Sequence, residues 1–361
     1  MMIKKRKKQI AVIALTPSII IINYLIKKFP NFIEKYYSVG INKPVRQFLS
    51  FITGICPFSV AELLFIVLII SLISIMFSIF AGLRKRKFIS RLLNLGVYLS
   101  ILYVLFMLAW GFNYDRLSFD KIAGIKIEKS SKQDLYALCS SLVQRANELR
   151  EKVVENNEGI MYIPGGYEDV FNRAQQGYDK AAVLYKELAG KYGRPKPVFL
   201  SEPMCYTGIT GIYMPYTGEA NVNIKVRDYM LPCTTAHEMA HQRGFAREDE
   251  ANYIAYISCI AHPDTDFQYS GVMLALISSM NALAGADIDM YKELAKNYSV
   301  GVRADLKDDS NFWKKYEGKV EKISDNVNNA YLKSNGQKDG VQSYGRMVDL
   351  LLAQYRADTG K

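Results

Sequence analysis

The stretch Thr234-Thr235-Ala236-His237-Glu238-Met239-Ala240-His241-Gln242-Arg243-Gly244 contains a His-Glu-x-x-His pattern. Residues four apart share one face of an α-helix, so His237 and His241 would project together and could bind one metal ion. Glu238 follows the first histidine and would lie beside the metal, where it suits a general base for water. Gly244 is a typical residue just after a helix, which favours a helix that ends there.

The whole chain has three histidines, and two of them fall within this pattern. That concentration argues against a chance match, although a buried helix that happens to carry two histidines remains the competing interpretation. The third histidine, His262, stands before a proline at a predicted helix end, and we assign it no metal.

Two protein ligands leave zinc under-coordinated, so the sequence should supply a third nearby. Arg247 occupies the place of an astacin-like third histidine. The Glu-x-x-Ala-Asn sequence that follows resembles the second helix of gluzincin metallopeptidases. That resemblance implies Glu248 as the third zinc ligand and Asn252 as the partner of a ligand histidine. Glu250 is the alternative third ligand, and acidic residues are also common at helix N-termini without any metal.

The segment from His237 to Asn252 as a whole resembles the DUF3810 proteins, a bacterial membrane family. The resemblance would span most of the chain. It implies N-terminal membrane helices followed by a zinc-peptidase-like domain, and it brings no substrate with it.

Three apolar runs, at 10–26, 58–83 and 92–112, are predicted to be transmembrane helices. The first run is short and follows a basic segment, but no small-residue cleavage site comes after it, which favours an uncleaved anchor over a signal peptide. A fourth apolar run at 267–286 contains serine, asparagine and several small residues. We interpret it as a buried core helix, and the expected number of spans is therefore three.

Basic clusters at 4–8 and 84–87 should stay cytoplasmic by the positive-inside rule. This topology describes a multi-pass cell-membrane protein with a cytoplasmic N-terminus and an extracytoplasmic domain from residue 113 onward. The loop 27–57 would then lie outside, although its five basic residues oppose that placement. Trp110 and Tyr114 would form an outer aromatic belt.

The net charge of +11 comes from the membrane region. Residues 1–112 contain 15 of the 46 basic residues and 2 of the 35 acidic residues, which leaves 31 basic and 33 acidic residues for 113–361. Because the second part has no basic excess, the electrostatic signature of nucleic-acid binding is absent, and we expect no nucleic-acid partner.

The part after residue 112 is predicted to be mainly helical, with helices over 132–155 and 167–192. Short strands are expected over 198–200, 209–214 and 220–226. The predicted fold is therefore a membrane α-helical region of three spans (1–112) and a mainly α, α+β zincin-like domain (113–361). A small β-sheet would lie beside the His-Glu-x-x-His helix. Residues 213–226 could bind an extended peptide through main-chain pairing, or form an ordinary hairpin over the core.

The five cysteines form no zinc-finger spacing, and their number is odd. An extracytoplasmic domain permits disulfides, and Cys205 with Cys233 is one candidate pair. The other interpretation is that all five are small buried hydrophobic residues.

The expected function is a membrane-anchored zinc metallopeptidase with one Zn²⁺ ion. His237, His241 and Glu248 would bind the ion and Glu238 would activate water to hydrolyse a peptide or protein at the outer membrane face. The alternative is a non-catalytic zinc-binding sensor, scaffold or assembly factor, in which the ion only holds two helices together. A third interpretation, a membrane structural protein with an accidental motif, predicts no bound metal.

Overall fold

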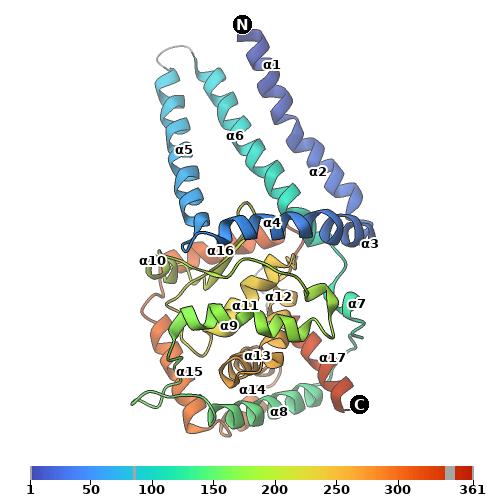
Figure 1. The fold of residues 1–361 in the computed structure, drawn as a ribbon, viewed down its shortest axis with the longest axis vertical. Helices are drawn as coiled ribbons and strands as arrows, with labels where there is room; N and C mark the ends of the chain where they lie inside the picture. The colour runs from blue at the N-terminus through green and yellow to red at the C-terminus, as the bar shows by residue number, and fades with distance from the viewer. Residues whose placement is uncertain (1, 84–86, 338–345, 360–361) are drawn as a thin grey trace. The chain divides into compact units, whose positions relative to one another are not determined.

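The computed structural model describes residues 2–83, 87–337 and 346–359 (Figure 1). It divides into two compact units, of which unit 1 comprises Met1–Leu117 with Met214–Glu219. Unit 2 comprises Ser118–Tyr213 with Ala220–Lys361. Residues 84–86 of the basic loop that we assign to the cytoplasm lie outside the described residues.

Unit 1 is built from apolar helices and one chain segment that runs across their ends (Figure 1). Its α-helices are α1 (Met2–Ile13), α2 (Leu15–Ile26), α3 (Pro30–Phe32), α4 (Lys43–Gly54), α5 (Val60–Leu83) and α6 (Phe88–Ala109). The π-helix η1 (Ile33–Asn42) joins α3 to α4, and the 3₁₀-helix η2 (Gly111–Asp115) follows α6.

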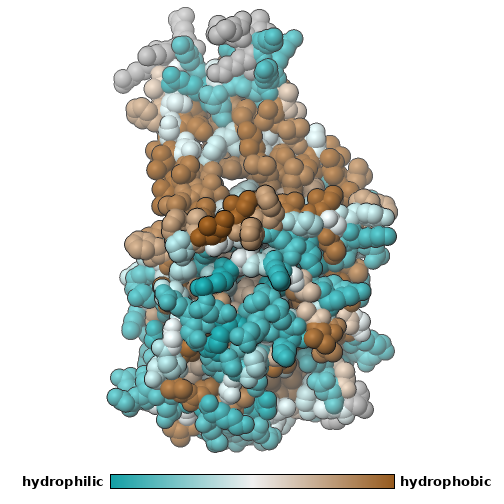
Figure 2. Space-filling model, in the orientation of Figure 1, coloured by the Kyte–Doolittle hydropathy of each residue, from teal (hydrophilic) through white to brown (hydrophobic). Residues whose placement is uncertain are grey.

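Three helical segments of unit 1 are long and apolar enough to cross a membrane: Arg6–Ile26, Val60–Leu83 and Phe88–Ala109. Between 6% and 11% of the most apolar part of each is buried, so their apolar side chains face outward. Figure 2 shows this hydrophobic surface over the unit 1 helices. These properties are consistent with a membrane protein. The bounds of the three segments lie within a few residues of the apolar runs expected from the sequence.

The aromatic belt that we predicted at Trp110 and Tyr114 is wrong. Both rings are buried and pack edge to face with centroids 6.3 Å apart. Tyr24 and Tyr36 instead are exposed; the ammonium groups of Lys27 and Lys28 lie over the Tyr24 ring, and that of Lys35 lies over the Tyr36 ring.

Unit 2 is mainly helical, as predicted. Its helices are α7 (Phe119–Ala123), α8 (Lys132–Arg150), α9 (Gly166–Ala181), η3 (Lys186–Leu188), α10 (Ser201–Cys205), α11 (Leu231–Gln242), α12 (Glu248–Ala261), α13 (Thr265–Ala286), α14 (Ile288–Ala295), α15 (Val300–Trp313), α16 (Lys319–Ser334) and α17 (Met347–Thr359).

Helix α13 lies at the centre of unit 2 and packs against α8, α11, α12, α14 and α17. It is also long and apolar enough to cross a membrane, but 56% of its most apolar part is buried. Phe267, Met273 and Leu276 on this helix are almost completely buried in one hydrophobic core. This burial agrees with a core helix at 267–286, while the number of spans remains a prediction.

A small three-stranded sheet of unit 2 has the order β1-β3-β2, with β1 at Lys196–Pro197, β2 at Gly211–Met214 and β3 at Glu219–Val222. Strand β3 pairs in parallel with β1. Because β3 lies in the middle of the sheet, it has no free edge for an added peptide strand, and peptide binding over 213–226 remains a prediction. Strand β2 lies at an edge of the sheet.

All five cysteines belong to the described residues, and each is a free thiol. The candidate disulfide between Cys205 and Cys233 is therefore wrong. Cys139, Cys205, Cys233 and Cys259 are buried, as expected for small hydrophobic side chains, and Cys56 is partly exposed.

Candidate metal centre

Helix α11 carries the His-Glu-x-x-His pattern and ends where the sequence predicts. Pro232 lies in its first turn. Gly244 has a φ of +87°, a left-handed conformation that favours glycine. Its N–H donates to the carbonyl of His241 (2.7 Å), and the N–H of Phe245 donates to the carbonyl of Ala240 (3.2 Å). This pair of hydrogen bonds is a Schellman motif, which closes the helix directly after the second histidine.

Helix α12 begins at Glu248 and brings that carboxylate to the two imidazoles. Glu248 Oε2 lies 3.2 Å from Nε2 of His237 and 3.5 Å from Nε2 of His241. The ligand atoms of these three residues all lie within 4.8 Å of one another, and the two rings are 4.6 Å apart between centroids. The structure thus brings together the three residues that the sequence offers as metal ligands.

Glu250, the alternative third ligand, serves elsewhere in unit 2. Its Oε1 accepts a hydrogen bond from the backbone N–H of Phe119 (2.9 Å) and forms an ion pair with Arg247. The hydrogen bond from Phe119 holds the first residue of α7 against the start of α12. Among the described residues, the group of convergent ligand atoms contains Glu248 and not Glu250.

The other nitrogen of each imidazole is held by a hydrogen-bond acceptor. His237 Nδ1 lies 2.8 Å from Oδ1 of Asn252, and His241 Nδ1 lies 2.7 Å from the carbonyl oxygen of Phe245. An acceptor at Nδ1 fixes a proton on that nitrogen, so Nε2, which faces Glu248, is the nitrogen available to a metal ion. Asn252 occupies the supporting position that the gluzincin resemblance implies.

Glu238 is buried beside this group, and its Oε2 has no hydrogen-bond partner among the described residues. Burial raises the pKa of Glu238 to about 7, although the two neighbouring imidazoles act in the opposite direction. A carboxyl group with a pKa near neutrality suits a general base. Gly211, the first residue of β2, lies so close that an added Cβ would be 2.4 Å from Glu238 Oε1.

The ligand group itself favours positive charge at its centre. Burial would lower the pKa of His241, but the carboxylates of Glu248 and Glu238 raise it to about 9. Burial would raise the pKa of Glu248, but the two imidazoles hold that pKa well below its usual range. A proton or a divalent cation between Glu248 and the imidazoles would supply this charge.

The residues fit a zinc ion by the chemistry of their donors. Two imidazole nitrogens and one carboxylate oxygen form a known catalytic zinc set that leaves one coordination position for water or substrate. Glu248 Oε2 is buried and close to both nitrogens, yet it lacks hydrogen-bonding geometry to either. A carboxylate oxygen so placed is suited to a shared cation.

Arg243 and Tyr178 stabilise α11 through buried contacts. The guanidinium of Arg243 lies over the Tyr178 ring, 3.6 Å from its centroid, and donates to the carbonyls of Leu188 and Met239. Tyr178 donates to the carbonyl of Ala236 (2.6 Å). A buried cation held by a ring and by carbonyl oxygens is well compensated, so these contacts stabilise the helix that carries the ligands.

Sequence reasoning missed three contributors to the site. Phe245 acts through its backbone carbonyl, which no side-chain pattern reveals. Gly211 precedes a strand, where close backbone approach is a known use of glycine, and this signal was available. Gln337 is buried, and its Oε1 lies 3.4 Å from the backbone nitrogen of Glu248. Gln337 is far from Glu248 in sequence, so no local pattern could identify this contact.

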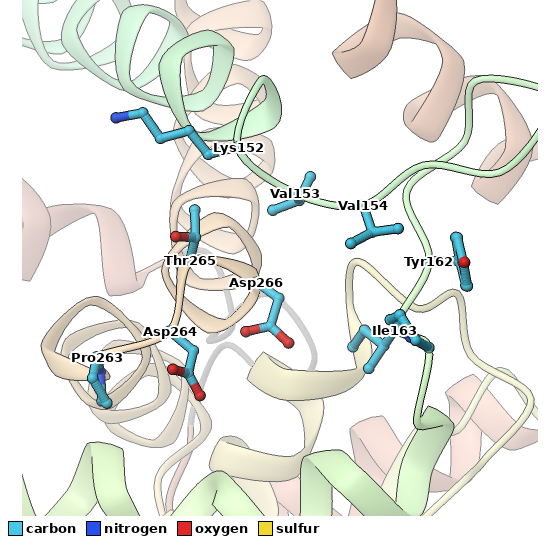
Figure 3. Close-up of a pocket in the computed structure, with 10 residues that line it drawn as sticks. Lys152, Val153, Val154, Tyr162, Ile163, Pro263, Asp264, Thr265 and Asp266 are labelled. Atoms are coloured by element: carbon cyan, nitrogen blue, oxygen red, sulfur yellow. The ribbon is translucent and has the colours of Figure 1, made fainter.

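A pocket of about 300 Å³ in unit 2 does not include the ligand group. It is lined by residues 152–154, 162–164 and 263–266 (Figure 3). Asp264 and Asp266 lie side by side at the start of α13 and both pair with Arg173, which offsets their charge. We therefore place the candidate chemistry at α11 and α12 and not in this pocket.

Apolar helices of spanning length and a buried His-Glu ligand group thus occur in one chain. A sequence model of the family described as "Protein of unknown function (DUF3810)" matches residues 37–352. The match covers most of the chain, which therefore belongs to this family, as the resemblance predicted. No curated protein and no solved structure matches the chain.

Proposed function

We propose that this protein is a membrane-anchored zinc metallopeptidase of the gluzincin type. The observation that carries the proposal is the convergence of His237, His241 and Glu248 within 4.8 Å, with the buried Glu238 beside them. Convergent donors on two consecutive helices, with a carboxylate next to them, favour a metal-assisted hydrolase.

Each residue has a separate role in this proposal. The zinc ion, when bound, would supply Lewis-acid activation of water and of a peptide carbonyl group. His237, His241 and Glu248 hold the ion, and the acceptors at Asn252 and Phe245 orient the two rings. Glu238 accepts the proton of the attacking water and passes it to the departing amine, for which a pKa of about 7 is suited.

The proposed substrate is an extracytoplasmic peptide or protein near the outer membrane face. The support is the charge pattern of the sequence, because the basic clusters at 4–8 and 84–87 favour a cytoplasmic N-terminus and a cytoplasmic loop before α6. Three spans would then place residues from 113 onward on the opposite side. Cysteine accessibility at engineered sites in 84–91 and 113–130 of the full chain would test this orientation.

The metal assignment is tested by elemental analysis of the full-length protein in lipid nanodiscs. We expect about one zinc per chain. Glu248→Ala should lose the zinc, whereas Glu250→Gln, which retains an acceptor for the N–H of Phe119, should keep it. Absence of metal from the wild-type chain, or zinc loss from the Glu250 variant alone, would contradict this ligand set.

The catalytic assignment is tested with Glu238→Gln. This variant should keep its zinc and lose hydrolysis of a fluorogenic peptide library, because the amide cannot accept the proton of water. The size of the loss expected for removal of a general base is about 10²–10⁴-fold. Zinc binding without hydrolysis by the wild-type chain would favour the non-catalytic sensor, scaffold or assembly factor instead.

A further inference from the structure

Residues 33–54 of unit 1 form one continuous helical segment, η1 followed by α4. Figure 1 shows this segment crossing the ends of α2, α5 and α6 instead of running parallel to them. The sequence alone suggested a loop between two spans. We call the segment the crossing helix.

The polar side of the crossing helix faces the protein. Ser38, Asn42, Arg46 and Ser50, which follow one another at four-residue spacing, are at most 2% exposed. Asn42 donates to the carbonyl of Ala109 (2.8 Å) and accepts from Asn113 (2.9 Å) and from Arg46. The charge of Arg46 is therefore buried in a hydrogen-bond network of unit 1.

The apolar side of the crossing helix faces outward. Phe51 is 70% and Ile55 76% exposed, and the same face includes Ile41, Val45, Phe48 and Ile52. This arrangement inverts the usual pattern of a water-soluble protein, in which the apolar side of a helix is buried. Contiguous apolar surface of this kind marks contact with a membrane or a protein partner.

Two features of unit 1 favour a bilayer as the occupant. The apolar face belongs to the same unit as the candidate spans, which also expose their apolar side chains. Lysines also accompany exposed tyrosines near its start: Lys27 and Lys28 lie 5.0 and 5.2 Å from the centroid of Tyr24, and Lys35 lies 5.2 Å from that of Tyr36. Aromatic rings with adjacent cations are typical of the headgroup layer, where ammonium groups reach lipid phosphates.

We propose that the crossing helix is an interfacial membrane helix that lies in the plane of the bilayer. Phe48, Phe51 and Ile55 enter the acyl-chain boundary of one leaflet, and the buried polar stripe faces the protein. An amphipathic helix in this position is immersed about 5–10 Å into the boundary between headgroups and chains. This inference is independent of the metal centre.

The test uses tryptophan fluorescence of the full-length protein in phosphatidylcholine vesicles that contain a minor fraction of phosphatidylglycerol. The chain has two tryptophans, so the double variant Trp110→Phe, Trp313→Phe has no tryptophan fluorescence of its own. In the tryptophan-free variant, the emission maximum of Phe51→Trp should shift to shorter wavelength. Lipids brominated near the carbonyl end of the acyl chain should quench most of its emission. Ile70→Trp, an exposed position in the middle of α5, provides a reference for deep quenching.

Val300→Trp is the matched aqueous control, because Val300 is 87% exposed on unit 2. It should respond to dissolved iodide and not to brominated lipid. The proposal is overturned if Phe51→Trp behaves like this control. It is equally overturned if the Phe51 probe is shielded from both quenchers and Phe51→Cys chains cross-link to one another, because a second copy would then cover the face.

Discussion

The general base of the proposed reaction depends on one glycine. Gly211 begins β2 and leaves the space that the Glu238 carboxyl group occupies. Its φ lies outside the left-handed region, so the requirement is for space and not for backbone freedom. A hydrolase that needs a buried carboxylate beside its metal must keep that space empty of side-chain atoms.

Gly211→Ala should therefore displace Glu238 without removing the metal ligands. The added methyl group would lie 2.4–2.7 Å from three atoms of Glu238, and a buried side chain has little room to move. A displacement of about 1 Å costs on the order of 10²-fold in rate. Zinc content and peptide hydrolysis measured together should show retained metal with lost activity.

Gly285→Ala provides the matched control, since an added Cβ there meets no atom of the described residues within 4 Å. It should preserve both zinc and activity. Full activity of Gly211→Ala would show that Glu238 is not held in the position from which it acts.

The candidate site was predictable to the extent that side chains in one short segment define it. The helical spacing predicted that His237 and His241 share a face, and the resemblance to gluzincins implied Glu248 and Asn252. The choice between Glu248 and Glu250 depends on where α12 begins relative to α11. It also depends on the partner of Glu250, the N–H of Phe119, which is 131 residues away in sequence. No local pattern contains that information.

At the scale of elements, unit 2 joins distant helices through one buried carboxylate. Asp305 on α15 is fully buried and accepts hydrogen bonds from Arg150 on α8 (2.7 Å), Tyr269 on α13 (2.6 Å) and the N–H of Met161 (2.8 Å). A buried carboxylate with this many donors has its desolvation well compensated. It fixes where α8 ends, because Arg150 is the last residue of that helix.

Asp305→Ala should strongly destabilise unit 2, because it leaves the buried Arg150 guanidinium and the Tyr269 hydroxyl with fewer partners. Loss of one member of a buried ion pair costs about 3–5 kcal/mol. Glu128→Ala is the control, because it removes a solvent-exposed ion pair with Lys126 and should leave stability unchanged. Thermal unfolding of both variants should separate them clearly; equal melting temperatures would contradict the structural role of Asp305.

The element boundaries show what periodicity alone could predict. The helix expected over 132–155 ends at Arg150, and the helix expected over 167–192 ends at Ala181. Val183 and Leu184 continue the apolar pattern but are 82% and 80% exposed, so they do not extend the buried face. The alternation over 220–226 predicted a strand, but β3 comprises only Glu219–Val222, and residues 223–226 form a turn. The alternation also could not show that this strand lies in the middle of the sheet, because strand order depends on long-range pairing.

At the scale of the whole molecule, the two units are not simply consecutive along the chain. The segment Met214–Glu219, which connects β2 to β3, belongs to unit 1. Within unit 1, Thr53 donates to the carbonyl of Thr217 (3.0 Å) and Tyr216 donates to the carbonyl of Leu102 (3.0 Å). The domain boundary predicted after residue 112 lies near Leu117, where the chain first passes from unit 1 to unit 2. No change in composition marks the return of the chain to unit 1 at Met214–Glu219.

Glu219 anchors this segment at the N-terminus of α5. Its carboxylate accepts hydrogen bonds from the backbone N–H groups of Val60 (3.1 Å) and Ala61 (2.7 Å). A negative charge at a helix N-terminus satisfies unpaired donors and interacts favourably with the helix dipole. Residues 118–361 produced alone would therefore contain a connection whose partners are missing.

We predict that the truncated chain 118–361 is cleaved by protease between Met214 and Glu219 much faster than the full-length protein in nanodiscs. In the full chain the connection is hydrogen-bonded and Glu219 is almost completely buried, whereas cleavage requires an exposed and extended segment.

Glu219→Ala in the full chain should give an intermediate cleavage rate, because it removes the anchor at α5 but leaves the hydrogen bonds donated by Thr53 and Tyr216. Mass spectrometry of the first fragments identifies the cleavage site. Equal cleavage rates in the truncated and full chains would show that the rest of unit 1 does not hold this connection. First cleavage at another position would show that the most accessible site of the truncated chain lies elsewhere.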